Sequence, residues 1–174
     1  MKKRVILIGA GGFGREVISW ANDAYKAGIF PAITSYLDDN SGALDGFPYD
    51  LEYLGSVNAY IPCADDSFIL GIGSVSTKRK IVDAFFSSLD RFLTLVHPTA
   101  VIAPSANIGR GVVVCPFALV SADTQIGDFV TINAMSSVGH DSVIGRFSTL
   151  SGHVDVTGQV HVGEEVFFGS GARV

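Results

Sequence analysis

The chain has 174 residues, enough for one or two small domains, and its hydrophobic content of 48% against 17% charged residues allows a substantial core. A net charge of −5 argues against a nucleic acid or an anionic membrane surface as the main partner. No apolar run reaches the ~18 residues of a membrane span. The two cysteines, Cys63 and Cys115, form neither a disulfide framework nor a metal-binding spacing. We therefore expect a cytoplasmic protein.

The chain begins with a strand, a glycine-rich loop and a helix. Val5 to Ile8 predicts a short buried strand, and Arg15 to about Ala27 predicts a helix. Glycines between a strand and a helix let backbone N–H groups approach a phosphate, and the helix N-terminus adds a favourable dipole. The alternative is that these glycines only permit a tight turn. The candidate substrate-binding residues of this loop are Gly9, Gly11, Gly12, Phe13 and Gly14.

Polar residues follow the next two predicted strands. Asp38 and Asp39 come directly after the strand expected at Ile33–Leu37, and they could hold a ribose hydroxyl, contact a base or cap the next loop. The strand expected at Phe68–Ile72 ends at Gly73, and Lys78 lies at the start of the helix expected at Thr77–Ser88. The cations of that helix either face solvent or supply one contact to a phosphate. We take Gly73 and Lys78 as further candidate substrate-binding residues.

These elements predict a small Rossmann-like α/β domain over residues 1–97, with Phe92–Val96 as a fourth strand of a parallel sheet. A domain of this length is too short for both halves of a dinucleotide-binding fold. A mononucleotide or a nucleotide sugar is therefore a better ligand than NAD, although an NAD-binding module remains an alternative.

Residues 98–174 follow a repeat of six. An aliphatic or aromatic residue occupies every sixth position from Ile102 to Val174, and a Ser, Thr, Ala or Val stands four places after each. Neither a helix nor an ordinary strand has this period. The repeat predicts a left-handed parallel β-helix of the hexapeptide kind, with three hexapeptides in each of about four coils. Glycine follows six of the anchor positions, and we expect it at corners that need positive φ.

One histidine has the setting of a general base. The four histidines are His97, His140, His153 and His161. No two are 18 residues apart, so they do not stack, and we predict no metal site. His140 precedes Asp141, and a carboxylate can orient an imidazole for general-base work near neutral pH. One coil later stands Gly158, which leaves space and a free N–H above the ring. The alternative is a surface histidine on a coil.

The whole chain resembles the hexapeptide-repeat sugar acyltransferases, in particular the UDP-4-amino-sugar N-acetyltransferases and the sialic acid O-acetyltransferases. The resemblance implies a Rossmann-like domain that binds a nucleotide sugar, a left-handed β-helix, and a homotrimer with active sites between subunits. It also implies acetyl-CoA as co-substrate and no metal. The stretches that carry it, in the family's order, are residues 9–14, 37–39, 71–73, 96–100 and 133–145.

The resemblance also implies roles for single residues. His140 falls on the family's catalytic base, Asp141 on the acid that orients it, and Asn133 on an active-site asparagine. Gly158 falls on a glycine whose N–H contacts the thioester carbonyl. Thr149 stands where many members have a second histidine near the coenzyme thiol, so we place it among the cofactor contacts.

We therefore predict an acetyl-CoA-dependent N-acetyltransferase that acts on the 4-amino group of a UDP-linked amino-dideoxy sugar by direct transfer. One alternative is O-acetylation of a sugar such as sialic acid. Another is a nucleotide-sugar-binding or scaffold protein without turnover. It arises because family members continue through a further coil and a terminal cap, which line part of the coenzyme A groove, whereas this sequence stops at Val174. We expect that coil and cap to be absent, through trimming or an early native end.

Overall fold

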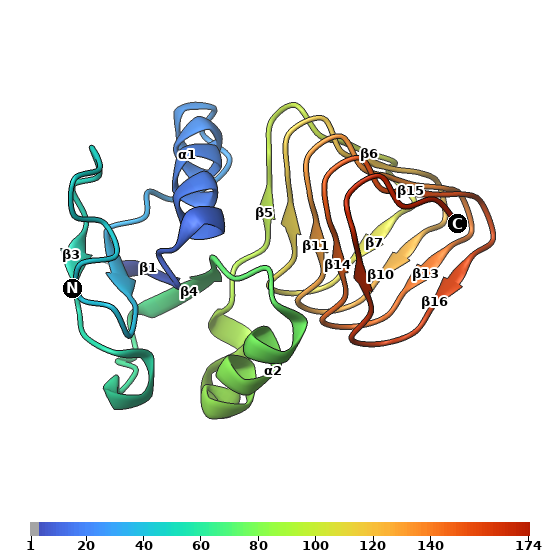
Figure 1. The fold of residues 1–174 in the computed structure, drawn as a ribbon. Coiled ribbons are helices and arrows are strands. Elements are labelled where there is room, and N and C mark those ends of the chain that lie inside the picture. Colours follow the sequence, from blue (N-terminus) through green and yellow to red (C-terminus); the bar gives the residue numbers. More distant parts are fainter. Residues whose placement is uncertain (1–3) are drawn as a thin grey trace.

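The computed structural model describes residues 4–174, without the side chains of residues 86 and 87. Figure 1 shows two parts: a small sheet with a helix on each face, and a triangular prism of stacked coils. Helices α1 (Gly12–Lys26) and α2 (Val75–Ala84) cover opposite faces of the sheet. None of the helices within residues 4–174 has the length and apolar character needed to cross a membrane.

The sheet has four parallel strands in the order β3-β2-β1-β4. The predicted strands at residues 5–8, 33–37 and 68–72 are present with bounds that shift by up to two residues. The sheet is buried because apolar residues occupy both faces of its central strand, as expected for a parallel sheet covered by helices. The strands are β1 (Arg4–Ile8), β2 (Ser35–Leu37), β3 (Glu52–Tyr53) and β4 (Asp66–Leu70).

The helices differ from prediction at their ends. Helix α1 begins three residues earlier than expected, so the last three residues of the glycine loop form its first turn. Helix α2 ends at Ala84, and the rest of the predicted helix is a 3₁₀ segment, η2 (Phe86–Arg91). A second 3₁₀ segment, η1 (Val57–Ala59), follows β3. Thus the N–H groups at the start of α1 belong to the glycine loop itself.

The predicted fourth strand at Phe92–Val96 is wrong. Strand β5 (Leu95–Val96) pairs with β8 (Val113–Val114) of the prism, and the chain before β5 meets the sheet only at an isolated bridge of Phe92 to Phe68, where the Leu93 N–H donates to Phe68 O. The fourth strand of the sheet is β3, at the edge opposite to β4. A short apolar run cannot tell a sheet strand from a coil strand, since both are buried. The domain boundary predicted at residue 98 remains a prediction, and coil pairing begins at Leu95.

The prism is a left-handed parallel β-helix with three faces, in which each strand pairs with strands 18 residues away. The faces are β16-β13-β10-β7, β17-β14-β11-β8-β5 and β15-β12-β9-β6. The remaining strands are β6 (Val101–Ile102), β7 (Asn107–Ile108), β8 (Val113–Val114), β9 (Leu119–Val120), β10 (Gln125–Ile126), β11 (Thr131–Ile132), β12 (Ser137–Val138), β13 (Val143–Ile144), β14 (Thr149–Leu150), β15 (Asp155–Val156), β16 (His161–Val162) and β17 (Phe167–Phe168).

The small polar residues of the repeat form hydrogen bonds with backbone groups at the corners of the prism. The hydroxyls of Ser136, Ser142 and Ser148 are buried, and each donates to a carbonyl 15 residues later. Each also accepts an N–H from 18 residues later. A buried corner would otherwise leave these backbone groups unpaired, at a cost of roughly 1–3 kcal/mol each. The small polar position therefore satisfies the backbone of the adjoining coil.

The role predicted for the glycines of the repeat is wrong. Positive φ falls three places after each anchor from Ile108 to Phe168, mostly on residues other than glycine, such as Phe117 and Met135. The glycines directly after the anchors are needed for a different reason. A Cβ at Gly127 would lie 2.8 Å from Arg146 N, and one at Gly139 would lie 2.5 Å from Gly158 N. These glycines therefore allow successive coils to stack closely.

An aromatic cluster joins the two parts. Phe129 and Phe147 sit at one corner of the prism, with their rings stacked at 5.2 Å and 10°. Phe129 meets Phe92 edge-on at 5.3 Å, and Phe92 packs on Phe68 of the sheet. Both corner rings are almost fully buried in the core of the N-terminal part. This corner thus fixes the prism to the sheet.

Candidate active site

The glycine loop is built by three interlocking glycines. Gly9 has φ of +88°, a conformation that favours glycine. A Cβ at Gly14 would lie 2.1 Å from the Gly9 carbonyl oxygen, and one at Gly71 would lie 2.3 Å from the same atom. Side chains at these positions would therefore separate the loop from the end of β4. In contrast, Gly11 and Gly12 have open space around them, so the backbone at the start of α1 is accessible.

Both predicted aspartates bind backbone groups at the end of the sheet. Asp38 accepts from the Ala10 N–H at 2.7 Å and from the Asn40 N–H at 2.9 Å. Asp39 accepts from the Val57 N–H at 3.1 Å. Asp38 therefore ties the glycine loop to the end of β2, a structural task that leaves its carboxylate partly engaged.

A cavity of about 270 Å³ opens beside these residues. Gly9, Asp38 and Asp39 all line it, so the structure brings these three predicted residues together. Gly12 and Phe13 line a separate, shallow hollow on the other side of the loop. The cavity also contains residues that sequence reasoning missed. They are Val57, Asn58, Ile72, Thr77, Lys80 and Ile81.

The prediction that Lys78 meets a phosphate does not fit its position. Lys78 is only 1% exposed, and its Nζ donates to the prism: to Phe129 O at 3.0 Å, Thr131 Oγ1 at 3.2 Å, Ser148 O at 3.2 Å and Thr149 Oγ1 at 2.8 Å. Burial lowers the pKa of Lys78 to about 7. The lysine of α2 that faces the cavity is Lys80, two residues further on.

The spacing of residues along α2 indicates that Lys78 is buried. The buried residues of α2 are Lys78, Ile81 and Val82, which have the spacing of one helix face. A lysine on that stripe points into the structure, whereas Lys80 is turned away from it.

Thr149 is likewise buried, at 3% exposure. Its hydroxyl accepts from Lys78 and donates to Gly73 O at 2.9 Å. Within one chain Thr149 therefore contacts both Lys78 and Gly73, and it has no free surface to offer a coenzyme. Its predicted role as a cofactor contact does not fit this position.

His140 and Asp141 form a pair at a different corner of the prism. His140 Nδ1 and Asp141 Oδ2 are 2.7 Å apart, and both side chains are more than half exposed. A Cβ at Gly158 would lie 2.7 Å from His140 Nε2, so the ring lies directly against this glycine. Among the bonds of residues 4–174, the Gly158 N–H has no acceptor. An oriented imidazole and a free N–H thus stand side by side on an open corner.

Asn133 lies on the same coil as His140, at the other end of β12. Its Oδ1 accepts the Ala134 N–H at 2.7 Å. The strand separates the two side chains, so Asn133 and His140 are not in contact within one chain. Across the described residues 4–174, no three His, Cys, Asp or Glu side chains gather as metal ligands.

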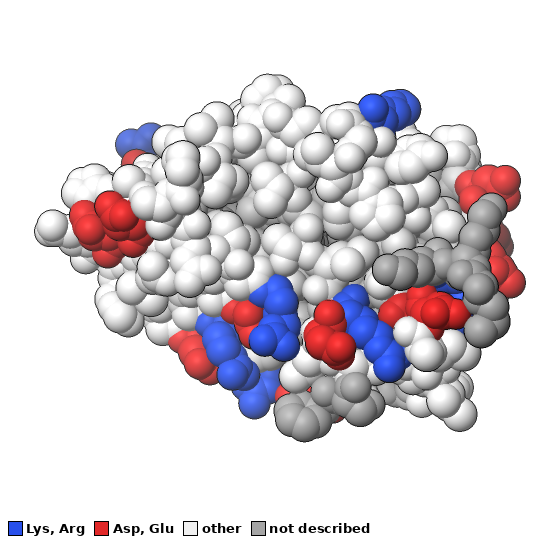
Figure 2. Space-filling view, turned by 180° about the vertical axis from the view of Figure 1, so that it is seen from behind, with Lys and Arg blue, Asp and Glu red and all other residues white. Residues whose placement is uncertain are grey.

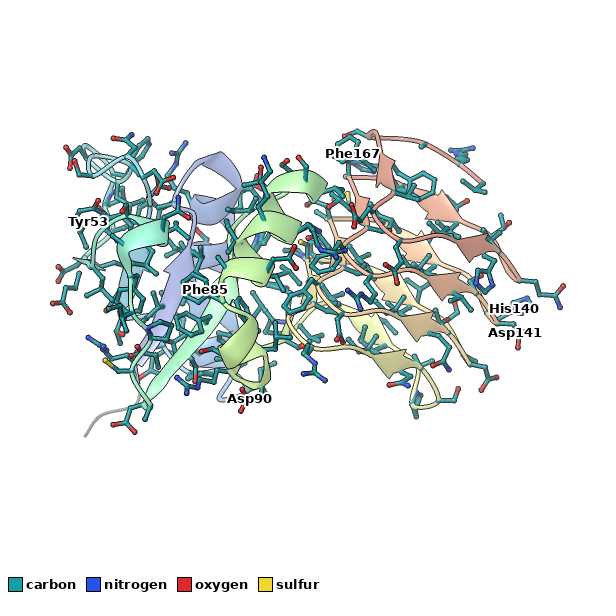
Figure 3. The ribbon with its side chains drawn as sticks, turned by 90° about the horizontal axis from the view of Figure 1, so that it is seen from below. Tyr53, Phe85, Asp90, His140, Asp141 and Phe167 are labelled. Atoms are coloured by element: carbon teal, nitrogen blue, oxygen red, sulfur yellow. The ribbon has the colours of Figure 1, made fainter. Side chains whose placement is uncertain are left out.

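The candidate residues thus form two groups that a single chain keeps apart. In Figure 3 the labelled His140 and Asp141 lie at the end of the prism that faces away from the sheet, whereas Tyr53 and Phe85 lie in the N-terminal part. The cavity with Gly9, Asp38 and Asp39 belongs to that N-terminal part.

Comparisons with known proteins match both parts. Residues 4–85 match the PglD N-terminal domain family. The acetyltransferase domain of PglB from Neisseria gonorrhoeae FA1090 has a TM-score of 0.75 at 26% identity, over 99% of this chain and 91% of that one. The N-terminal part thus resembles this domain family, and the whole chain resembles an acetyltransferase domain.

Two further similar proteins are informative. The UDP-N-acetylbacillosamine N-acetyltransferase of Bacillus subtilis (strain 168) is 30% identical over 119 residues, which cover 64% of this chain. The match spans about half of that protein (51%). PerB from Caulobacter crescentus, solved with CoA and GDP-perosamine, has a TM-score of 0.73 at 23% identity, over 98% of this chain and 88% of that one. At that identity the likeness concerns the fold.

Proposed function

We propose that this protein is an acetyl-CoA-dependent N-acetyltransferase that acts on the 4-amino group of a UDP-linked amino-dideoxy sugar. The observation that carries the proposal is the His140–Asp141 pair, with the ring held against Gly158. The acceptor class is supported by the relative from B. subtilis, whose name specifies a UDP-linked amino sugar. The coenzyme is supported by the acetyltransferase domain of PglB, which has also been solved with acetyl coenzyme A.

The corner at His140 offers most of the groups that acetyl transfer to an amine requires. A sugar amine is a nucleophile once it is neutral, so the transfer needs a base, an N–H donor for the thioester oxygen, and good alignment. His140 Nε2 would take the proton of the attacking amine, while Asp141 orients the ring through Nδ1 and stabilises the imidazolium. The Gly158 N–H would donate to the carbonyl oxygen as negative charge develops there. The thiolate of coenzyme A leaves directly, without an acyl-enzyme.

The separation of the two groups supports a site shared between chains of a homotrimer. The sugar would be presented by the cavity of one chain to His140 of another. Apolar side chains are exposed along the face and edge of the prism beside β9, where a second copy could bury them. They are Val101, Phe117, Leu119 and Met135. In the view of Figure 2, charged side chains gather mainly along one edge and leave a wide uncharged surface.

The test is thiol release from acetyl-CoA in the presence of UDP- and GDP-linked 4-amino sugars, with sialic acid as a hydroxyl acceptor. Turnover that is confined to a UDP-4-amino sugar is the expected result. Turnover on sialic acid alone, or on none of the acceptors while a UDP-sugar still binds, would contradict the proposal.

Mixing two inactive variants tests whether the site is shared. A His140→Ala chain lacks the base, and a Gly14→Val chain has a distorted glycine loop, because a side chain at this position would clash with the Gly9 carbonyl. If sites lie between chains, co-refolded mixtures regain part of the activity, because some sites combine an intact cavity with an intact His140. Mixtures that stay inactive would place each site within one chain.

A further inference from the structure

Lys78 is the most unusual buried side chain outside the proposed catalytic corner. It leaves α2 of the N-terminal part and ends inside the prism, where it reaches two carbonyls and two hydroxyls. These acceptors belong to two successive coils, since Phe129 and Thr131 lie one coil before Ser148 and Thr149. One Nζ therefore joins the helix to two coils at once.

The contacts of Lys78 continue through Thr149 to the chain segment that lines one side of the cavity. Thr149, which accepts from Lys78, donates to the carbonyl of Gly73 at the end of β4. Two residues earlier, Gly71 is packed against the glycine loop. A continuous path of direct contacts thus runs from the coils of the prism through Thr149 to the residues that shape the cavity.

Within the described residues 4–174, no carboxylate forms an ion pair with this lysine. Neutral oxygens alone face its Nζ, and the charged residues of the same corner pair with one another instead. Arg79 binds Asp83 and Glu165, and Arg146 lies near Glu164. Burying an unpaired ammonium is costly, and an apolar residue of similar size often stabilises a protein equally well. A role in stability alone is therefore a poor explanation for Lys78.

A comparison with the neighbouring aromatic cluster shows what Lys78 contributes to the contact between the two parts. Phe129 and Phe147 attach the prism to the sheet through apolar contact, which is non-directional and tolerates sliding and rotation. The hydrogens of Nζ, at most three, are shared among four fixed oxygens, and such hydrogen bonds are directional. We propose that Lys78 is a positioning residue that fixes the orientation of the nucleotide-binding part on the prism. The consequence for turnover rests on the proposed function, because the cavity must present the sugar at a set angle to His140 of another chain.

The first experiment measures orientation without relying on catalysis. Spin labels are attached to the exposed Cys63 and to an Asn107→Cys substitution on the prism, while the buried Cys115 stays unlabelled. Labelled chains are diluted with unlabelled chains, so that only distances within one chain are recorded. We expect a narrow distance distribution in the parent chain and one at least twice as broad in Lys78→Met. The matched control is Lys26→Met, an exposed lysine at the end of α1.

Met is suited to this test because it keeps the length and loses only the donors. Ser148 O retains its bond from the Thr131 N–H, so the coil itself stays paired and the variant is expected to fold. An unchanged distance distribution in Lys78→Met would overturn the proposal, whatever the melting temperature does. A broadened distribution in both Lys78→Met and Lys26→Met would overturn it as well.

The second experiment links orientation to turnover. We expect Lys78→Met to lower kcat at least tenfold while the Kd for the nucleotide sugar changes less than threefold, because the cavity is intact but misdirected. A merely structural lysine would change the melting temperature and leave kcat unaltered, and that result would overturn the positioning role. If the parent chain turned over no nucleotide sugar, the proposed function would fail, while the distance measurement would still decide on Lys78.

Discussion

The prism and the N-terminal part hold their residues by different means. In the prism every position has counterparts 18 residues before and after it, so a coil is specified by a pattern that repeats along the stack. In the N-terminal part each contact occurs once, as in the packing of Gly14 on Gly9. The repeat builds a rigid frame, and the proposed functional contacts lie where side chains depart from its pattern. His140 against Gly158 is one such departure, and the buried rings of Phe129 and Phe147 are another.

The largest expected effect on turnover comes from removing the proposed base in the prism. We expect His140→Gln to lower kcat by roughly 10²–10⁴-fold, the usual contribution of general-base catalysis. Steady-state thiol release measures it, and calorimetry should show unchanged binding of the nucleotide sugar in the other part of the molecule. The control is His161→Gln, another exposed prism histidine, which should keep full turnover. Equal activity of the two variants would remove His140 as the base.

A smaller change at the same corner tests positioning of the ring. A Cβ at Gly158 would meet His140 Nε2 at 2.7 Å and Cε1 at 2.9 Å, so Gly158→Ala must push the imidazole aside. We expect kcat to fall by about 10–100-fold, because displacements near 1 Å can cost that much. The control is Gly163→Ala, where an added Cβ has no atom within 4 Å. If both alanine variants kept normal turnover, the contact between the ring and Gly158 would be irrelevant to catalysis.

The corresponding test in the N-terminal part is a substitution of one of the closely packed glycines of the glycine loop. In Gly14→Ala the new Cβ would lie 2.1 Å from the Gly9 carbonyl oxygen, so the loop must open. Overpacking of this kind costs typically 1–3 kcal/mol of folding free energy. We expect a lower melting temperature and about tenfold weaker binding of the nucleotide sugar, measured by calorimetry. Gly12→Ala, with open space at its Cβ, should melt like the parent chain. Unaltered affinity in Gly14→Ala would reduce the loop to a simple turn.

The same contrast decides what could be predicted from the sequence. The repeat of six predicts the prism, its strand positions and its inward-facing residues, because each coil confirms the next. In the N-terminal part, β1 and α1 follow from local pattern, but Leu95–Val96 was assigned to the wrong sheet. A buried pair of apolar residues fits either sheet, and only tertiary packing separates the two.

Errors about single residues have physical causes too. Lys78 was taken as a candidate phosphate contact because lysine is rarely buried, although its spacing to Ile81 and Val82 places it on the buried face. The glycines after the anchors were assigned to positive φ, whereas at Gly127, Gly139 and Gly145 close stacking of neighbouring coils requires them. The separation of His140 from the cavity depends on how the two parts are joined, and no local pattern encodes that.

The smallest expected effect is the pH dependence of stability that Lys78 contributes. Burial lowers its pKa from 10.5 to about 7, so between these values the unfolded chain carries a proton that the folded chain has released. The free energy of unfolding therefore rises with pH across this window, and below about pH 7 the lysine is protonated in both states and adds no slope. We expect the melting temperature of the parent chain to rise relative to that of Lys78→Met by roughly 5–15 degrees between pH 6.5 and about pH 9.5. Lys80→Met, which alters an exposed lysine of the same helix, should follow the parent chain. If the difference between the parent chain and Lys78→Met stayed flat over this range, Lys78 would keep an ordinary pKa, and the cost of its burial would have to be met by contacts that hold it charged.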